Sequence, residues 1–170
     1  MGKIKEAVSN SGPLIHLSQV KSFDAFEIIE KIYITNEIFS EVCSSELPGN
    51  KEVRESKLIE VKDLKDRSKD MSKLISQKYS LDLGEATAIS LAKQEKIKLF
   101  FTDDLAARIV AKELGLEVHG TIGIILRAFR SGIFTKERAL KIIENLHTKS
   151  SIFITKDLVN YIIREINDYR

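Results

Sequence analysis

The chain has 170 residues, of which 43% are hydrophobic and 31% charged, a composition typical of a globular protein with a substantial core. With 27 basic and 25 acidic residues, the net charge of +2 excludes an overall basic field that would by itself require nucleic acid. The single cysteine, Cys43, excludes an internal disulfide, and the sequence shows neither a long apolar run nor a signal-peptide pattern. We therefore expect one cytoplasmic domain over residues 1–170 that does not enter a membrane.

The first half of the chain alternates between strand-like and helix-like segments. Residues 6–9 predict a short strand, and the next segment predicts a helix that Asn10 or Ser11 caps, with Pro13 in its first turn. The further predicted elements are a strand at 31–35, a helix at 37–45 capped by Asn36, a break at 46–50, a strand at 57–64 and a helical segment at 65–78.

The second half continues this alternation around its most apolar segment, "IKLFFT" at 97–102, which predicts a buried strand. The other predicted elements are a helix at 85–96 opened by Gly84, a helix at 105–114 closed by Gly115, a strand at 116–120, a helix from Thr121 closed by Gly132, a helix at 136–147 capped by Thr135, a candidate strand at 152–155 and a helix at 156–166. Strands that alternate with helices predict an α/β fold with a mainly parallel sheet.

Acidic and amide side chains fall at special places on this map. Asn10 follows the first strand, and Asp103 and Asp104 follow the buried strand. The carboxyl ends of parallel strands meet at one edge of a sheet, where such folds bind ligands. Glu85 lies in the first turn of its helix, and Glu41 lies in the helix after strand 31–35. Converging oxygens of this kind predict a site for hard divalent cations, which can activate water for phosphodiester cleavage.

Each of these residues also has a simpler interpretation. Asp104 can cap the following helix, and Asp103 can be a solvated acid in a turn. The helix dipole favours Glu85 in a first turn without any function. Glu41 can be an ordinary surface glutamate, and Asn10 can be a turn or cap residue. The metal site is therefore predicted by the combination of residues.

Three stretches carry a family resemblance: "AVSNSGPLIHLSQV", "LDLGEATAISLA" and "LFFTDDLAARIVAKELGLEVHGTIGIILRA". Together they resemble PIN-domain proteins, and more narrowly a prokaryotic subgroup with SN-x-x-PLI, LGEA and G-T-x-G motifs. The resemblance covers about residues 6–130 and implies a PIN-like, Rossmann-like parallel sheet flanked by helices, with a helical C-terminal extension over 131–170. It also implies a ribonuclease that depends on Mg²⁺ or Mn²⁺, often the toxin of a toxin–antitoxin pair.

The family pattern implies metal-binding and catalytic roles for Glu41, Glu85 and Asp104, and it places Asp103 where a water or a second ion could be held. Asn10 stands where family members commonly have Asp, so it would supply a neutral oxygen ligand. The missing charge should weaken metal binding. It leaves open a catalytically weak or inactive module that binds RNA or a protein partner such as an antitoxin.

Basic residues that could contact RNA phosphates are spread along the second half of the chain. Arg108 lies one turn beyond the two aspartates, and Arg127 and Arg130 share a helix face. A row of such cations beside the acids would fit RNA cleavage. A solvated face is the alternative, and we favour it for the basic residues at 136–141.

Other catalytic chemistries have less support in the sequence. Cys43 has no identifiable histidine partner, which favours a structural thiol over a nucleophile. His16, His119 and His147 are scattered and form no metal-binding pair with helical spacing.

The helices at 122–131 and 136–147 carry several apolar positions, and we do not expect a chain this short to cover all of them with its own core. These positions are Ile122, Ile125, Leu126, Phe129, Leu140 and Ile143. Because related PIN proteins commonly dimerise, we expect a homodimer. The alternative is that the last helix, residues 158–166, covers this surface.

Overall fold

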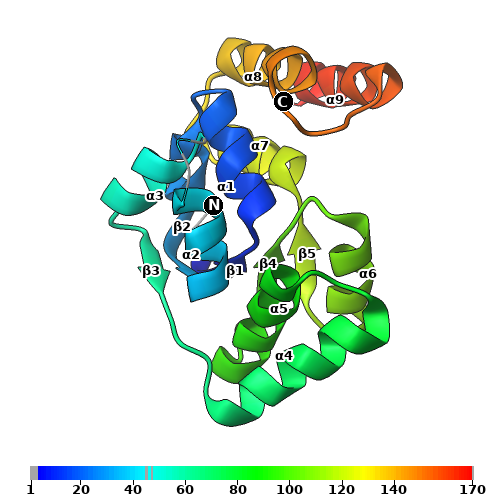
Figure 1. Cartoon of the computed structure of the whole chain (residues 1–170). Helices are drawn as coiled ribbons and strands as arrows, with labels where there is room; N and C mark the ends of the chain where they lie inside the picture. The colour runs from blue at the N-terminus through cyan, green and yellow to red at the C-terminus, as the bar shows by residue number, and fades with distance from the viewer. Residues whose placement is uncertain (1–3, 45, 47, 170) are drawn as a thin grey trace.

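The chain folds around a parallel β-sheet that helices flank (Figure 1). The structure, a computed structural model, describes residues 4–44, 46 and 48–169. In this part of the chain the sheet has five strands in the order β3-β2-β1-β4-β5, and each neighbouring pair is parallel. The strands are β1 (Ile4–Ser9), β2 (Ile29–Ile34), β3 (Ile59–Val61), β4 (Leu99–Phe101) and β5 (Glu117–His119). The predicted α/β fold with a parallel sheet is confirmed.

Helices connect the strands and form the C-terminal part of the chain (Figure 1). They are α1 (Ser11–Gln19), the 3₁₀ helix η1 (Phe23–Ile28), α2 (Asn36–Cys43), α3 (Asn50–Glu55), α4 (Asp66–Tyr79), α5 (Leu83–Glu95), α6 (Leu105–Glu113), α7 (Thr121–Arg130), α8 (Lys136–Lys149) and α9 (Lys156–Asp168). The sequence did not predict η1 or α3. Gly49 has a φ of +106° just before α3, so the predicted break is a tight turn after which the chain becomes helical again.

Several predicted boundaries differ from the structure. Thr35, not Asn36, is the N-cap of α2, because its hydroxyl accepts a hydrogen bond from the Ile38 amide at 3.3 Å. The strand predicted at 57–64 is reduced to β3, which pairs only with β2 and lies at the edge of the sheet. The stretch 152–155 forms a loop between α8 and α9 instead of a strand. Ser45 and Leu47, at the predicted end of one helix and in the break after it, lie outside the described residues.

The core lies between the sheet and its helices, and α5 contributes a run of buried residues to it. This helix packs against β1 and β4, and its fully buried residues include Ala88 and Ile89. On the strands, Val8 and Phe100 are fully buried and stand side by side in the sheet register. A strand that is buried on both faces reads as a continuous apolar run, which explains why "IKLFFT" predicted β4 well.

The order of the strands creates a crevice at the centre of the sheet. The chain leaves β1 toward β2 on one side and leaves β4 toward β5 on the other, so β1 and β4 flank the point where the winding reverses. Ser9 pairs with Phe101 at the end of these strands, and the Asn10 amide still donates to the Phe101 carbonyl at 2.8 Å. Asn10 and the residues that follow Phe101 therefore emerge together.

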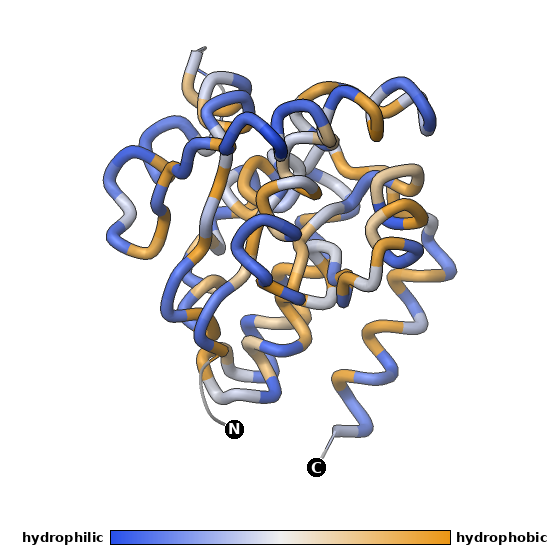
Figure 2. The backbone as a smooth tube through the Cα atoms, turned by 90° about the horizontal axis from the view of Figure 1, so that it is seen from below, coloured by the Kyte–Doolittle hydropathy of each residue, from blue (hydrophilic) through white to orange (hydrophobic). Residues whose placement is uncertain are grey.

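The two last helices pack side by side, and α8 also contacts α7 (Figure 1). Hydrophobic and hydrophilic residues alternate along α9 (Figure 2), which buries Val159, Ile162 and Ile166. The ring of Tyr169, just after α9, meets the ring of Phe129 edge-on, with 5.3 Å between the centroids. Of the six apolar positions considered for a dimer interface, Ile125 and Ile143 are fully buried within one chain, and the other four are partly buried against the core. Among the described residues, no helix is long and apolar enough to cross a membrane.

Candidate functional site

A cavity of about 460 Å³ opens at the crevice beyond β1 and β4. It collects side chains from segments that are far apart in the sequence. Its wall includes Asn10, His16, Glu85, Asp103, Asp104 and Phe153. Four of the five predicted metal ligands therefore line one cavity, and the fifth, Glu41, lies close by.

Thr102 joins the two strand ends that support the cavity. Its side chain is fully buried, and its hydroxyl oxygen accepts hydrogen bonds from the Asp104 amide at 3.2 Å and from Nδ2 of Asn10 at 3.3 Å. The carbonyl of Thr102 accepts a hydrogen bond from Nη2 of Arg108 at 3.2 Å. Thr102 was not among the predicted site residues, although a threonine placed before two acids was a signal of such a role.

Asp104 combines both roles considered from the sequence. It is the N-cap of α6, and its Oδ1 accepts a hydrogen bond from the Ala107 amide at 2.7 Å. The residue is nevertheless exposed, and it lines the cavity. Capping uses one carboxylate oxygen and leaves the negative charge available to the cavity.

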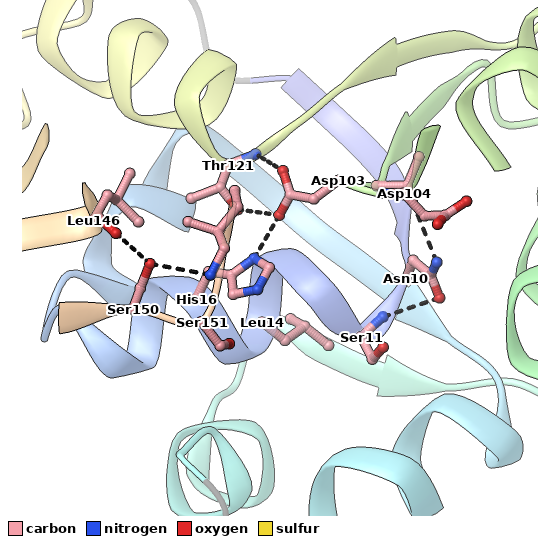
Figure 3. A network of polar contacts seen from close by, with 12 residues as sticks. Asn10, Ser11, Leu14, His16, Asp103, Asp104, Thr121, Leu146, Ser150 and Ser151 are labelled. Atoms are coloured by element: carbon pink, nitrogen blue, oxygen red, sulfur yellow. Dashed lines mark hydrogen bonds and ion pairs between the residues drawn. The ribbon is translucent and has the colours of Figure 1, made fainter. Parts of the chain in front are cut away.

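Asp103 points in a different direction from Asp104 and is held by protein donors (Figure 3). Its Oδ2 contacts Nδ1 of His16 at 2.7 Å and accepts a hydrogen bond from the Thr121 hydroxyl, while its Oδ1 accepts from the Thr121 amide at 2.7 Å. A Cβ on Gly120 would lie only 2.7 Å from the same Oδ1, so the close approach requires glycine. Asp103 is therefore a clamp that joins α1 and α7 to the end of β4, and it is not a solvated turn residue.

Glu85 is half-buried at the start of α5, opposite the end of β4. Its Oε2 accepts a hydrogen bond from the Asp82 amide at 3.2 Å as part of a capping box. The pKa of Glu85 is raised to about 7, chiefly by burial and then by the charge of Asp104. The hydrogen bond from the Asp82 amide opposes this shift, and the charges of Asp82 and Glu41 add smaller contributions to it. Burial and the neighbouring negative charges therefore both disfavour the ionised form of Glu85.

Glu41 reaches the same region from α2. Its Oε1 accepts a hydrogen bond from the Ser11 hydroxyl at 2.7 Å, directly after Asn10. Its Oε2 lies 3.2 Å from the place that a Cβ on Gly84 would occupy. Glycine next to Glu85 thus lets the carboxylate of Glu41 approach α5.

The chain matches the family model described as "DUF3368: PIN domain" over residues 6–168. It belongs to the PIN-domain family. The match extends through α9, so it includes the C-terminal helices beyond the resemblance at about 6–130. No curated protein and no solved structure matches the chain significantly.

PIN domains generally use divalent metals, and the donors in this PIN domain fit such an ion in kind. Carboxylate oxygens from Glu41, Glu85 and Asp104 and the amide oxygen of Asn10 are the hard ligands that Mg²⁺ and Mn²⁺ prefer. Among the described residues, however, no three His, Cys, Asp or Glu side chains form a ready-made metal-binding group. The site thus supplies oxygen donors and unbalanced negative charge without a preassembled cage.

The three arginines predicted to contact RNA lie in three different places. Arg108 lies at the carboxyl edge of the sheet, beside Thr102. Arg127 lines a separate cavity with Lys5 and Lys98 at the amino ends of β1 and β4, the opposite edge. Arg130 pairs with Glu165 of α9 at 3.9 Å. Of the three, only Arg108 therefore lies at the same edge of the sheet as the acidic cavity, and it contacts Thr102 without lining that cavity.

The cysteine and histidines also have defined surroundings. Cys43 is buried, and burial raises the pKa of its thiol, as expected for a structural residue and not for a nucleophile. Of the three histidines, all in the described part of the chain, His16 alone lines the acidic cavity, where it contacts Asp103. No helical spacing links His16 to another histidine, so its place at this site was not predictable from the sequence.

Proposed function

We propose that this PIN domain hydrolyses RNA phosphodiester bonds with Mg²⁺ or Mn²⁺ bound at the carboxyl edge of the sheet. Glu85 and Asp104 would be the principal ligands, assisted by Glu41 and by the oxygen of Asn10. The observation that supports this most strongly is the convergence of Asn10, Glu85 and Asp104 on one cavity, with Glu41 bonded to Ser11 next to them, because clustered carboxylates are stabilised by a bound cation. The place of this cavity at the switch point of a parallel sheet agrees with where such folds bind ligands.

A bound cation of this kind supplies an activated water and neutralises charge on the phosphate. The protein's own residues would provide orientation and charge. Arg108 would attract the phosphate from beside Thr102, while Thr102 keeps Asn10 and Asp104 in place through its hydroxyl. Asp103 would act as a positioning residue, since its oxygens are already occupied by His16 and Thr121.

The second candidate function is a catalytically weak or inactive module on the same fold that binds RNA or a protein partner. Two observations favour it. Asn10 is neutral, and no three metal-binding side chains of the types that usually hold an ion are grouped in the described residues. A toxin role with an antitoxin partner would be a special case of the first function, and a small neighbouring reading frame that encodes a co-purifying protein would support it.

Cleavage of a labelled single-stranded RNA with Mn²⁺, with Mg²⁺ and with EDTA tests the proposal. We expect cleavage only with a divalent cation, and we expect Glu85→Gln to reduce it to the level in EDTA. Gln can keep the capping box, so the variant should remain folded. Glu144→Gln, at an exposed position on α8, is the matched control and should cleave normally. Binding of RNA without cleavage under any of these conditions would favour the inactive module.

A further inference from the structure

The loop between α8 and α9 carries an aromatic ring that the rest of the chain leaves uncovered. Phe153 is 91% exposed, whereas Ile154 is buried and Ile152 is half-buried against the core. Phenylalanine is usually buried, because removal of its ring from water is favourable. A ring held in water between two packed isoleucines therefore indicates a role outside the core.

Contacts on both sides of Phe153 hold this loop in place. The amide and the hydroxyl of Ser151 donate to Oε1 of Gln19 in α1, at 2.8 and 3.1 Å. On the other side, Nδ1 of His147 donates to the carbonyl of Ile154 at 3.1 Å. Ser151 lines the acidic cavity together with His16, and both are labelled in Figure 3. The ring is thus presented from an anchored loop and not from a free tail.

Phe153 lines the same cavity as Glu85 and Asp104. A nucleic acid whose phosphate lies at these carboxylates therefore has its bases near the ring. Two exposed lysines, Lys149 and Lys156, flank the loop along the chain. They lie four residues before and three residues after Phe153, at the two ends of the loop. Proteins that bind single-stranded nucleic acids combine such cations, which hold the phosphates, with an aromatic ring, which holds a base. An apolar peptide would gain nothing from these lysines.

Building on the proposed nuclease function, we propose that Phe153 stacks on an unpaired base of single-stranded RNA bound at this cavity. Every base offers a flat face, so the contact would select single strands over duplexes without selecting a sequence. The bases of a duplex are already stacked and paired, and they would have to be pulled out first. Phe153 would thereby position the strand next to the carboxylates.

Tryptophan fluorescence tests the contact directly. The chain contains no tryptophan, so Phe153→Trp introduces a single reporter. Titration with a short oligouridine RNA, in an Asp104→Asn background that prevents cleavage, should quench its emission by stacking. Tyr161→Trp is the matched control. It places one tryptophan on α9, at a position that is 60% exposed and does not line the cavity, and its emission should not change.

Affinities measured by fluorescence anisotropy of labelled RNA add a second readout. We expect Phe153→Ala to weaken binding of single-stranded RNA roughly 10- to 100-fold, the range for loss of one base stack. Phe153→Tyr should retain the affinity for single-stranded RNA. Neither variant should change the affinity for duplex RNA. Leu105 is another exposed apolar residue on this cavity, and Leu105→Ala should have little effect because leucine has no aromatic face.

Any one of the following results would overturn the stacking role. If Phe153→Ala binds and cleaves RNA normally, or if the tryptophan at 153 is not quenched by bound RNA, Phe153 has no such role and the nuclease function stands. Equal losses in Phe153→Ala and Leu105→Ala would indicate general apolar docking. A blue shift that grows with protein concentration without RNA would show that a second copy covers the ring. If no form binds or cleaves RNA, the proposed function fails together with this inference.

Discussion

At the scale of single residues, the carboxylate of Glu85 is the most informative group. Burial raises its pKa to about 7 in the folded protein from an ordinary value of 4.5, and the nearby charge of Asp104 acts in the same direction. The folded state thus binds a proton more tightly than the unfolded state between these two pH values. Without metal, stability should fall as pH rises from about 4.5 to about 7, and it should then remain lower.

Replacing Glu85 by Gln should remove this pH dependence, because glutamine stays neutral at every pH. We expect Glu85→Gln to raise the melting temperature in EDTA at pH 8 by roughly 2–4 °C for each kcal/mol of relieved repulsion. At pH 5 the two proteins should melt at similar temperatures. Thermal melts across this pH range check the prediction, and parallel curves for the two proteins would rule it out.

Asn10 gives a second prediction at this scale. Its Oδ1 accepts a hydrogen bond from the Ser11 amide at 3.0 Å, which Asp can replace, but Nδ2 donates to Thr102, which Asp cannot do. In EDTA, Asn10→Asp should therefore destabilise the protein by about 1–3 kcal/mol through the lost donor and the added charge. With Mn²⁺ the same charge should strengthen cation binding, so the gain in melting temperature should exceed that of the wild type. Identical gains would mean that position 10 does not face the ion.

The two neighbouring aspartates show what the sequence could and could not tell about single residues. The capping role of Asp104 was predictable, because a cap depends on residues three positions away. The clamp formed by Asp103 was not, because its partners His16 and Thr121 are 87 and 18 residues away in the chain. Local patterns identify an acid at the end of a strand, but only the fold decides which donors meet it.

At the scale of elements, segments with a clear apolar pattern or cap were predictable, including the three-residue strand β4, whereas η1 and α3 were not. The existence of β1, β4 and the helices α4 to α9 followed from apolar periodicity and caps. The isoleucines and the phenylalanine of the stretch at 152–155 predict a strand, but in the described structure this stretch does not pair with the sheet. One isoleucine packs into the core and the phenylalanine faces the cavity instead. Tertiary contacts override local preference most easily in segments this short.

The junction between β5 and α7 provides a prediction for an element. A Cβ at Gly120 would lie 2.7 Å from Oδ1 of Asp103 and 2.7 Å from Nη2 of Arg108. The arginine side chain can move, whereas the aspartate is held by His16 and Thr121. Gly120→Ala should therefore displace Asp103 and cost about 1–3 kcal/mol in unfolding free energy, as other overpacked sites do.

Denaturant unfolding measures this cost in free energy. Gly115→Ala is not a suitable control, because Gly115 has a φ of +81° and alanine would be strained there. Gly12→Ala is the better comparison, since a Cβ there would meet only ordinary contacts, at 3.5 Å or more. Unfolding free energies that fall equally in both variants would show that the close approach at Gly120 has no special importance.

At the scale of the whole molecule, the C-terminal helices change the basis for expecting a homodimer. The apolar positions on α7 and α8 are covered by the chain itself, in part through Tyr169 on Phe129. The dimer remains a prediction that now rests on the family resemblance. Light scattering at high micromolar concentration should then give twice the chain mass of 19.3 kDa. A mass near that of one chain would contradict the dimer without affecting the proposed site.

The proposed function requires that the carboxylates beyond β1 and β4 form one divalent cation site. Calorimetric titration of Mn²⁺ into the wild type and Asp104→Asn tests it most directly, because Asn caps α6 as well as Asp and the fold should be preserved. We predict that the wild type binds Mn²⁺ and that the variant binds it at least about 10-fold more weakly, as expected when a charged ligand is lost. Equal affinities in the two proteins, or no binding by the wild type, would contradict a cation site at this edge of the sheet.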